Sequence, residues 1–442
     1  MHILLIQAYL GRGEPPVAPL GLASLAAHLT EHQVKIFDPN LSTRPFEETV
    51  SVIEDFKPDI VGFSLRNVDT TKYSDQFYYF EHFRKFVGSL AKTFPGMTIV
   101  VGGAGFSLFP VTIMERIPEI EVGFYLEGEW TFSQFVKNGT GGSGIPGLFI
   151  RSSQNIELTG PPPRMAFDDL LPPAWEIVDV SAYLPYAGKA SIGIEAKRGC
   201  ALKCAYCTYP LISGDEVRIK PAYKVVDELV NLKERFGVDR IFFCDPVFNY
   251  PSEHAESICR EILDRNLNIR WGAYHQDRFL TAEYIRLATE SGCDEFYFSP
   301  DAATNEGLKI LNKVSTVKSL HRSLHLIAGE GRARTSYNFF AAVPGTGWKN
   351  WLAAVRFLIK AKLKLGKRLT RWKLSYIRLE PLTPLAKEIL GERTGAEPLL
   401  PSNSRELNRL FLRKSRSVLL NVLLSLHYCL GKRFGRKNVI GD

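Results

Sequence analysis

Three cysteines lie within eight residues of this 442-residue chain, at Cys200, Cys204 and Cys207. Three thiolates on one loop can hold three irons of a cubane cluster, which usually takes four cysteines, so the fourth iron stays open to a substrate. A structural zinc site is the alternative, but zinc takes a fourth ligand and typically uses two separated pairs. The remaining cysteines are scattered, at positions 244, 259, 293 and 429. The spacing therefore favours an iron–sulfur cluster.

The charge of the chain is unevenly distributed. The net charge is +8, yet residues 349–378 carry ten Lys/Arg and no Asp/Glu, and residues 402–440 carry nine Lys/Arg with Glu406 as the one acid. The rest of the chain is mildly acidic, which excludes a uniformly basic nucleic-acid binder. With 45% hydrophobic and 23% charged residues, the composition also excludes a disordered, collagen-like or coiled-coil chain.

The ends of the chain and its cysteine count indicate a compartment. Residues 1–6 lack the basic and long apolar regions of a signal peptide and predict a buried strand. The apolar stretch 418–430 is shorter than the about 20 residues that span a bilayer. Seven cysteines, an odd number, argue against a disulfide framework. We therefore expect a cytoplasmic protein.

Residues 1–150 alternate short apolar strands with amphipathic helices. The expected strands are 2–7, 33–37, 59–64, 97–101, 121–125 and 147–150, and the expected helices are 20–32, 46–56, 73–94, 110–117 and 130–137. This pattern predicts a doubly wound α/β domain of the flavodoxin or Rossmann kind, whose ligands lie beyond the carboxyl ends of the strands. Loops 8–19, 65–71 and 102–109 are therefore candidate ligand loops.

The remainder of the chain predicts a second domain and an extension. Residues 151–190 are rich in Pro and Gly and are interpreted as a connector. A second series of strands follows, at 191–197, 240–244, 268–273, 295–299, 335–341 and 373–378. Six such units predict a partial (β/α)6 barrel over residues 191–385, with its active site at the carboxyl ends of the strands. Residues 386–442 are expected to be a basic, mainly helical extension.

The cysteine loop resembles that of the radical S-adenosylmethionine (SAM) superfamily. The C-x₃-C-x₂-C spacing, the aromatic Tyr206 before the last cysteine, and the position after the first strand of a six-unit domain all match. The resemblance implies a [4Fe–4S] cluster on Cys200, Cys204 and Cys207, whose open iron chelates SAM and cleaves it to methionine and a 5′-deoxyadenosyl radical. It also implies that Tyr206 packs near the adenine.

Further SAM contacts are carried over from the same resemblance. Asp245, after the second strand, resembles an acidic residue that takes the methionine amino group, and capping of the next turn is the alternative. Ser299 or Asp301, after the fourth strand, would reach the ribose. Gly345, in the loop after the fifth strand, would lie near the adenine.

The whole layout, over residues 1 to about 390, resembles the branch of the superfamily with a cobalamin-binding domain. The segments 19–26, 57–64, 100–103 and 126–132 support it. Cofactor contacts are then expected from the candidate loops 65–71 and 102–109 and from the segment 126–132, namely Leu65, Arg66, Asn67, Gly102, Gly103, Gly105 and Glu127. The three glycines would let the corrin or its nucleotide tail approach the backbone, and a tight βα turn is the alternative. The D-x-H-x-x-G signature is absent, since Asp38-Pro39-Asn40 has no His. Residues 65–67 are expected near the lower face of the corrin.

Four residues at the predicted mouth of the barrel are candidates for contact with the substrate. Tyr274 and His275 follow the third strand, and Arg378 and Glu380 follow the sixth. His275 has the chemistry of a general acid or base, and a hydrogen-bonded structural role is its alternative.

The expected function is that of a cobalamin-dependent radical SAM methyltransferase acting on an unactivated carbon, or phosphorus, of a small or specialised metabolite. One alternative is a radical SAM enzyme without cobalamin that performs cyclisation, rearrangement or aminocarboxypropyl transfer. Another is an iron–sulfur sensor or electron-transfer protein without turnover. The enzyme would need an external donor of the flavodoxin or ferredoxin type. Residues 405–437 predict either an interfacial helix on anionic lipid or a helix buried against the barrel.

Overall fold

The computed structural model describes residues 1–11, 14–73, 75–152, 155–189, 191–391, 400–412 and 418–433. It divides into two compact units. The first comprises the described residues of 1–70, 77–193 and 394–404, and the second comprises those of 71–76, 194–393 and 405–442. Within the described chain, each unit is built around one seven-stranded sheet.

The sheet of the first unit has the strand order β2-β1-β3-β4-β5-β6-β7. Its strands are β1 (His2–Gln7), β2 (Gln33–Phe37), β3 (Ile60–Ser64), β4 (Thr98–Gly102), β5 (Val122–Phe124), β6 (Leu148–Arg151) and β7 (Ile156–Leu158). The first five are parallel, whereas β6 and β7 are antiparallel additions. The chain moves outward from β1 to β2 and then returns past β1 to β3, so the order reverses between β1 and β3. This confirms the doubly wound fold, in which ligands bind at such a reversal.

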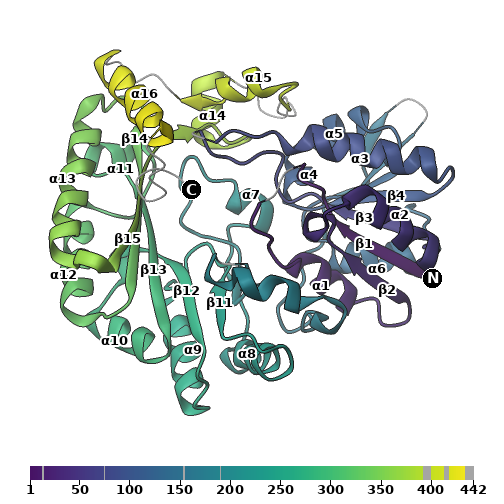
Figure 1. Cartoon of the computed structure of the whole chain (residues 1–442), viewed down its shortest axis with the longest axis horizontal. Helices are drawn as coiled ribbons and strands as arrows, with labels where there is room; N and C mark the ends of the chain where they lie inside the picture. Colours follow the sequence, from purple (N-terminus) through teal and green to yellow (C-terminus); the bar gives the residue numbers. More distant parts are fainter. Residues whose placement is uncertain are drawn as a thin grey trace. The chain divides into compact units, whose positions relative to one another are not determined.

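Helices cover both faces of this sheet (Figure 1). They are α1 (Leu20–Ala27), α2 (Pro45–Phe56), α3 (Tyr79–Thr93), α4 (Ala104–Leu108), α5 (Pro110–Arg116) and α6 (Glu129–Lys137). On one face, Leu22 of α1 and Phe132 of α6 share a core with Leu5 of β1. On the other face, the ring of Phe83 in α3 meets that of Phe63 in β3 edge-on, with centroids 5.5 Å apart. Burial on both faces explains why the central strands β1, β3 and β4 are largely continuous apolar runs in the sequence.

The sheet of the second unit has the order β16-β15-β14-β13-β12-β11-β8. Its strands are β8 (Gly193–Ile194), β11 (Arg240–Phe243), β12 (Arg270–His275), β13 (Cys293–Asp301), β14 (Arg334–Ala342), β15 (Leu369–Arg378) and β16 (Phe411–Leu412). The strands from β11 to β15 are parallel, and β16 is antiparallel. A separate antiparallel ribbon joins β9 (Lys197–Arg198) to β10 (Arg218–Ile219). The parallel strands confirm the expected partial barrel.

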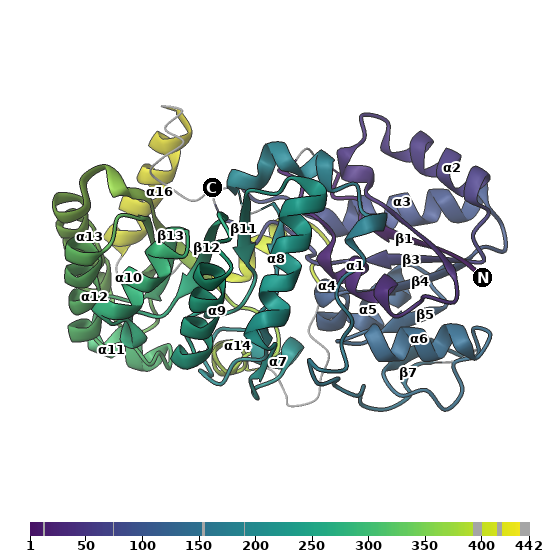
Figure 2. The ribbon, with the colours of Figure 1, turned by 90° about the horizontal axis from the view of Figure 1, so that it is seen from below.

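Helices line the outer face of this second sheet (Figures 1 and 2). They include α8 (Ala222–Phe236), α9 (Ser252–Asp264), α10 (Ala282–Glu290), α12 (Val317–Glu330) and α13 (Trp348–Leu365), with the short α7 (Tyr209–Ser213) and α11 (Asn305–Ile310) beside the strand ends. Tyr337 of β14 packs edge-on against Phe357 of α13, with ring centroids 5.1 Å apart. Since side chains alternate along a strand, the neighbours of these outer residues face the inside of the barrel.

The C-terminal region is mainly helical, as expected, with α14 (Pro384–Leu390), α15 (Ser404–Arg409) and α16 (Val418–Arg433). Leu420 and Leu424 of α16 are buried, whereas Val418, Val422 and Leu426 are exposed. Residues 405–437 were predicted to form either an interfacial helix on lipid or a helix buried against the barrel. Of this segment, residues 413–417 and 434–437 lie outside the described residues. None of the described helices combines the length and apolar character that crossing a membrane requires.

Candidate active site

The three cysteines lie on the loop between β9 and α7. Gly199, which precedes them, has a φ of +85°, and a Cβ at this position would lie 1.9 Å from the carbonyl oxygen of Glu216. The amide of Cys200 donates to the carbonyl of Gly214 at 2.9 Å, and that of Cys207 donates to the carbonyl of Cys204 at 3.2 Å. Glycine is therefore required where the loop begins, and main-chain hydrogen bonds hold the loop in its folded form.

The thiols of this loop are free, half-buried and close enough to influence one another. Burial raises the pKa of Cys200 and of Cys204, and it raises the pKa of Cys207 to about 11, with both other thiols adding to the last effect. The amide of Tyr209 points at the sulfur of Cys207 at 3.4 Å. No set of three or more His, Cys, Asp or Glu side chains in the described ranges forms a single-ion site. Three mutually close thiols are the donor set that an iron–sulfur cluster uses, and ligation would deprotonate them.

A buried ionic cluster ties the cysteine loop to the end of β13. The hydroxyl of Tyr206 donates to the carboxylate of Asp301. Lys313, in the loop before α12, donates from Nζ to Asp301 Oδ2 at 2.7 Å, to the Ser299 carbonyl at 2.9 Å and to Tyr206 Oη at 3.2 Å. Burial alone would lower the pKa of Lys313, but Asp301 raises it well above its usual value. Burial and Asp301 both raise the pKa of Tyr206. Nothing in the sequence motif pointed to Lys313.

This cluster changes the interpretation of Asp301. The sequence suggested that its carboxylate reaches the ribose of SAM, but the structure commits it to Lys313 and Tyr206. Ser299 keeps a half-buried side chain, whose Oγ accepts from Asn338 Nδ2 at 3.4 Å. Ser299 therefore faces the inside of the barrel without an ion pair. Of the two candidates for the ribose contact, it is the one whose side chain can reach a ligand.

Asp245 retains one open carboxylate oxygen. Its Oδ1 accepts from the amides of Ala196 at 2.9 Å and Lys197 at 3.2 Å. Its Oδ2 is buried and has no hydrogen-bond partner among the described residues. Burial raises the pKa of Asp245 to about 6, although Lys197 acts in the opposite direction. A buried acceptor left open in this way fits the amino group of a ligand, since an unsatisfied carboxylate oxygen costs free energy.

The buried cation beside Asp245 was not predicted. Lys197 is 1% exposed, and its Nζ donates to the carbonyls of Phe248 at 2.6 Å and Tyr250 at 2.8 Å. Burial lowers the pKa of Lys197 to about 8, and Asp245 and Cys200 partly counteract this effect. Lys197 thus holds the loop after β11 through two main-chain carbonyls.

Of the two roles considered for His275, the structure supports the hydrogen-bonded structural one. Its Nε2 contacts the Tyr284 hydroxyl at 2.9 Å and its Nδ1 contacts the Ala273 carbonyl at 2.9 Å. Burial lowers its pKa to about 3, so the ring is neutral and structural. Tyr274 points to the inner face instead, where its side chain is 39% exposed. Alternation along β12 separates these two neighbours.

The other residues of the predicted mouth contact one another or form a turn. Arg378 and Glu380 form an ion pair, with Nε and Oε1 3.4 Å apart. Gly345 has a φ of +81° in a turn closed by the Thr346 amide on the Val343 carbonyl at 3.2 Å. This turn geometry by itself requires a glycine.

In the first unit, the glycines after β4 serve the protein backbone itself. Gly103 has a φ of +99°, and a Cβ there would lie 2.7 Å from the Leu65 carbonyl oxygen. A Cβ on Gly105 would lie 3.0 Å from the same oxygen, and one on Gly102 would lie 3.4 Å from Phe124. The sequence attributed these glycines to close approach of a corrin or its tail. The structure instead assigns Gly103 and Gly105 to the close packing of this loop on residues 65 and 66.

A cavity of about 110 Å³ lies where the strand order reverses, and both Arg66 and Asn67 line it. Gln7 of β1 and Ser64 of β3 contribute further polar groups. Glu127 lies apart from it, half-buried in the turn between β5 and α6. A cavity of this size suits a polar side group of a large ligand rather than a whole ring system.

Asp38 serves structure rather than ligation. Its carboxylate accepts from Gln7 Nε2 at 2.8 Å, from Tyr183 Oη at 2.9 Å and from the amide and side chain of Asn40 at 2.9 and 2.8 Å. Burial raises the pKa of Asp38 against these donors. The segment without the signature His is therefore a hydrogen-bonded junction.

Comparison with known families matches each domain separately. Residues 6–136 match the B12 binding domain, and residues 194–358 match the Radical SAM superfamily. The two matches follow in the order that the sequence predicted, and they fall on the first and second sheets.

Two curated relatives are methyltransferases. An uncharacterized methyltransferase of Pyrococcus horikoshii is 28% identical over 302 residues, which cover 67% of this chain and 63% of that protein. Cytidylyl-2-hydroxyethylphosphonate methyltransferase of Streptomyces wedmorensis is 25% identical over 363 residues, which cover 70% of this chain and 65% of that protein. The chain thus spans slightly less than two thirds of each relative.

A solved structure shares the fold. The radical SAM methyltransferase TsrM from Kitasatospora setae, with tryptophan and a SAM analogue bound, matches with a TM-score of 0.76 at 24% identity. The match covers 88% of this chain and 76% of that one, so both sheets belong to the shared architecture.

Proposed function

Because residues 6–136 match the B12 binding domain and residues 194–358 match the Radical SAM superfamily, we propose that this chain is a cobalamin-dependent radical SAM methyltransferase. The observation that carries the proposal is the group of three free, mutually close thiols on one loop of a partial barrel, preceded by a doubly wound domain. The names of the two curated relatives support methyl transfer. The acceptor would be an unactivated carbon, or phosphorus, of a small or specialised metabolite.

When bound, the [4Fe–4S] cluster would supply reductive cleavage of SAM and cobalamin would supply methyl transfer. Cys200, Cys204 and Cys207 would hold the cluster, and Lys313 would fix the loop that carries them. The open Oδ2 of Asp245 would accept from the amino group of SAM.

Other contacts in this proposal rest on position alone. Ser299 lies at the carboxyl end of β13, where its hydroxyl would reach the ribose, and the exposed turn at Gly345 would pass the adenine. On the substrate side, Tyr274 and the Arg378–Glu380 pair stay as candidates.

In the first unit, Leu65, Arg66, Asn67 and Glu127 are the proposed cobalamin contacts. The backbone of residues 65 and 66 is fixed by the glycines packed on it, and Arg66 is exposed beside the cavity. The catalytic barrel would occupy residues 191–385.

An external electron donor of the flavodoxin or ferredoxin type and a cytoplasmic location belong to the same proposal. The six cysteines whose side chains the structure describes are all free thiols, which suits a reducing compartment.

The test is anaerobic purification with iron and cobalamin supplied, followed by metal analysis of the wild type and of a variant with all three cysteines changed to Ala. We expect about four irons and one cobalt per chain in the wild type and loss of iron alone in the variant. Reductant and labelled SAM should then yield 5′-deoxyadenosine or methyl transfer to an acceptor. Iron without cobalt would favour a radical SAM enzyme that does not use cobalamin, and zinc without iron would contradict the cluster itself.

A further inference from the structure

One row of side chains crosses the inner face of the second sheet. Tyr274 pairs with Tyr297, Tyr297 pairs with Ser336, and Ser336 pairs with Arg371 across successive parallel strands. Paired residues of parallel strands point to the same face, and the outer face is the one on which His275 packs against α10. The row therefore faces the inside of the barrel.

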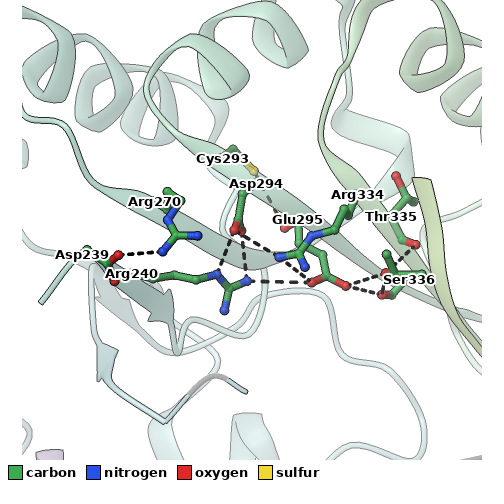
Figure 3. A network of polar contacts seen from close by, with 10 residues as sticks. Asp239, Arg240, Arg270, Cys293, Asp294, Glu295, Arg334, Thr335 and Ser336 are labelled. Carbon is green, nitrogen blue, oxygen red and sulfur yellow. Dashed lines mark hydrogen bonds and ion pairs between the residues drawn. The ribbon is translucent and has the colours of Figure 1, made fainter. Parts of the chain in front are cut away.

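Arg371 differs from the other arginines of these strands because it has no anionic partner among the described residues. Arg240 holds Asp294 through two contacts of 2.9 Å, and Arg334 holds the same carboxylate at 3.1 Å (Figure 3). Arg270 holds Asp239 at 2.6 Å. The guanidinium of Arg371 is exposed and makes no hydrogen bond or ion pair among the residues that the structure describes.

Glu295, an acidic side chain of the inner face, already has partners. Glu295 is 1% exposed, and its Oε1 accepts from Ser336 at 2.7 Å (Figure 3). The same oxygen accepts from Thr370 at 2.9 Å. Its Oε2 lies 3.8 Å from Arg240 and 3.5 Å from Arg334. Glu295 thus lies close to Arg240 and Arg334 near the amino ends of the strands. Among the described residues it forms no ion pair with Arg371, so the Arg371 guanidinium can pair with an anionic ligand.

Aromatic rings form the end of the row opposite Arg371. The rings of Tyr274 and Tyr297 are 5.7 Å apart, and Phe242 stands edge-on to both, at 5.7 and 5.4 Å. Burial raises the pKa of Tyr274, and it raises that of Tyr297 to about 12, while Arg371 is close enough to lower both. Tyr274 is nevertheless 39% exposed, so the residue is accessible to a ligand.

A second positive charge lies on the same face. Lys373 follows Arg371 by two residues on β15 and pairs with Asn338, whose side chain reaches Ser299. Lys373 therefore adds a second basic side chain to this face of β15, next to Arg371.

We propose that this row is a substrate site, in which Arg371 binds a carboxylate or phosph(on)ate group and Tyr274 packs against the apolar or planar part of the same molecule. The inference rests on the proposed function, since it names the substrate class for that barrel. A guanidinium forms two parallel hydrogen bonds to such an oxygen group, which a lysine cannot reproduce. The substrate of this enzyme is accordingly an anion.

The test measures binding of small probes to the anaerobic holoenzyme by ligand-observed NMR. The probes are phenylphosphonate and phenylacetate, which represent the two anionic groups, and benzyl alcohol as the neutral analogue. We expect the wild type to bind an anionic probe more tightly than the alcohol. Arg371→Met should weaken anion binding about ten- to a hundredfold, the loss typical of a hydrogen bond to a charged group, without changing binding of the alcohol.

Two further variants separate the contact from net charge. Arg371→Lys should restore only part of the affinity, because it keeps the charge and loses the paired hydrogen bonds. Arg356→Met removes the same charge from an exposed position of α13 and should change nothing. Equal anion binding in wild type and Arg371→Met, or no anion binding at millimolar concentration in the wild type, overturns the inference. Iron and cobalt contents of the same preparations test the proposed function independently, because a wild-type protein that lacks both metals contradicts it whatever the probes do.

Discussion

Replacing Lys313 tests whether the buried ionic cluster holds the cysteine loop. The side chains of Lys313 and Asp301 are each 6% exposed, and the Nζ–Oδ2 distance is 2.7 Å. Removing one partner of such a pair leaves the other charge buried without a counterion, which costs about 3–5 kcal/mol. We therefore expect Lys313→Met to lower the free energy of unfolding of the second unit by about 3–5 kcal/mol.

The same loop provides a matched control. Lys203 and Asp215 form a pair at 3.4 Å, with side chains 66% and 64% exposed. Exposed pairs contribute about 0–1 kcal/mol, so Lys203→Met should cost less than about 1 kcal/mol. The two substitutions remove the same charge and differ in burial.

The measurement is urea unfolding of the cluster-free protein, followed by fluorescence and by hydrogen exchange of β13. A double variant, Lys313→Met with Asp301→Asn, removes both charges and should be less destabilised than the sum of the single changes. The reasoning is refuted if Lys313→Met costs no more than Lys203→Met, or if the single effects simply add. Iron occupancy should fall with Lys313→Met, because Tyr206 and its loop lose their anchor.

Three further predictions concern the cysteines, a glycine and a histidine. Cys204→Ala should abolish iron binding and leave cobalt content unchanged by metal analysis; loss of both would show that the two sites depend on one another. Gly103→Ala should cost more than about 2 kcal/mol in a urea titration, since it adds an unfavourable φ and a contact with a carbonyl oxygen. Gly21→Ala, in a helix with open space, should be neutral or stabilising by up to about 1 kcal/mol. Because burial lowers the pKa of His275 to about 3 from 6.5, protonation favours the unfolded state below pH 6.5, and the wild type should lose about 2 kcal/mol from this group between pH 6.5 and 5. His275→Phe should flatten that part of the pH profile in parallel urea titrations, and an unchanged slope would contradict the assignment.

Most of the strands could be predicted because parallel strands buried on both faces leave continuous apolar runs. The predicted ranges 2–7 and 33–37 coincide with β1 and β2, and the other strands of the first five differ from prediction by about a residue at either end. The strands β7 and β16 were missed, because two or three residues are too few to show a period. Both are antiparallel additions to an edge, where pairing depends on tertiary contacts.

The site was predictable only where spacing carries the information. The cysteine motif is local, so its loop was located correctly, whereas Lys313 comes from a distant loop and has no spacing signal. His275 was expected at the mouth of the barrel but lies on the buried outer face of the sheet, and its sequence neighbours could have indicated this. Trp271 and Ala273 precede it at intervals of two, and both are apolar, which assigns the third member of the series to the buried face. The close packing of Gly103 and Gly105 on residues 65 and 66 could not be predicted, because that segment lies almost forty residues earlier in the chain.

The strand β13 connects the arginine network, the proposed substrate row and the cysteine loop. Every second residue along it contacts the next of these in turn, from its amino end to its carboxyl end. Glu295, near the amino end of β13, lies close to Arg240 and Arg334 (Figure 3). Tyr297 belongs to the proposed substrate row, and the Ser299 carbonyl accepts from Lys313. At the end, a register shift and a φ of +66° turn Asp301 toward Tyr206 on the cysteine loop. Ion pairs at both ends therefore fix this strand lengthwise, and the same strand sets the distance between the cluster loop and the row that would bind the substrate. A substitution that loosens either ion-paired end should consequently disturb the alignment of cofactor and substrate, even though neither end touches the substrate.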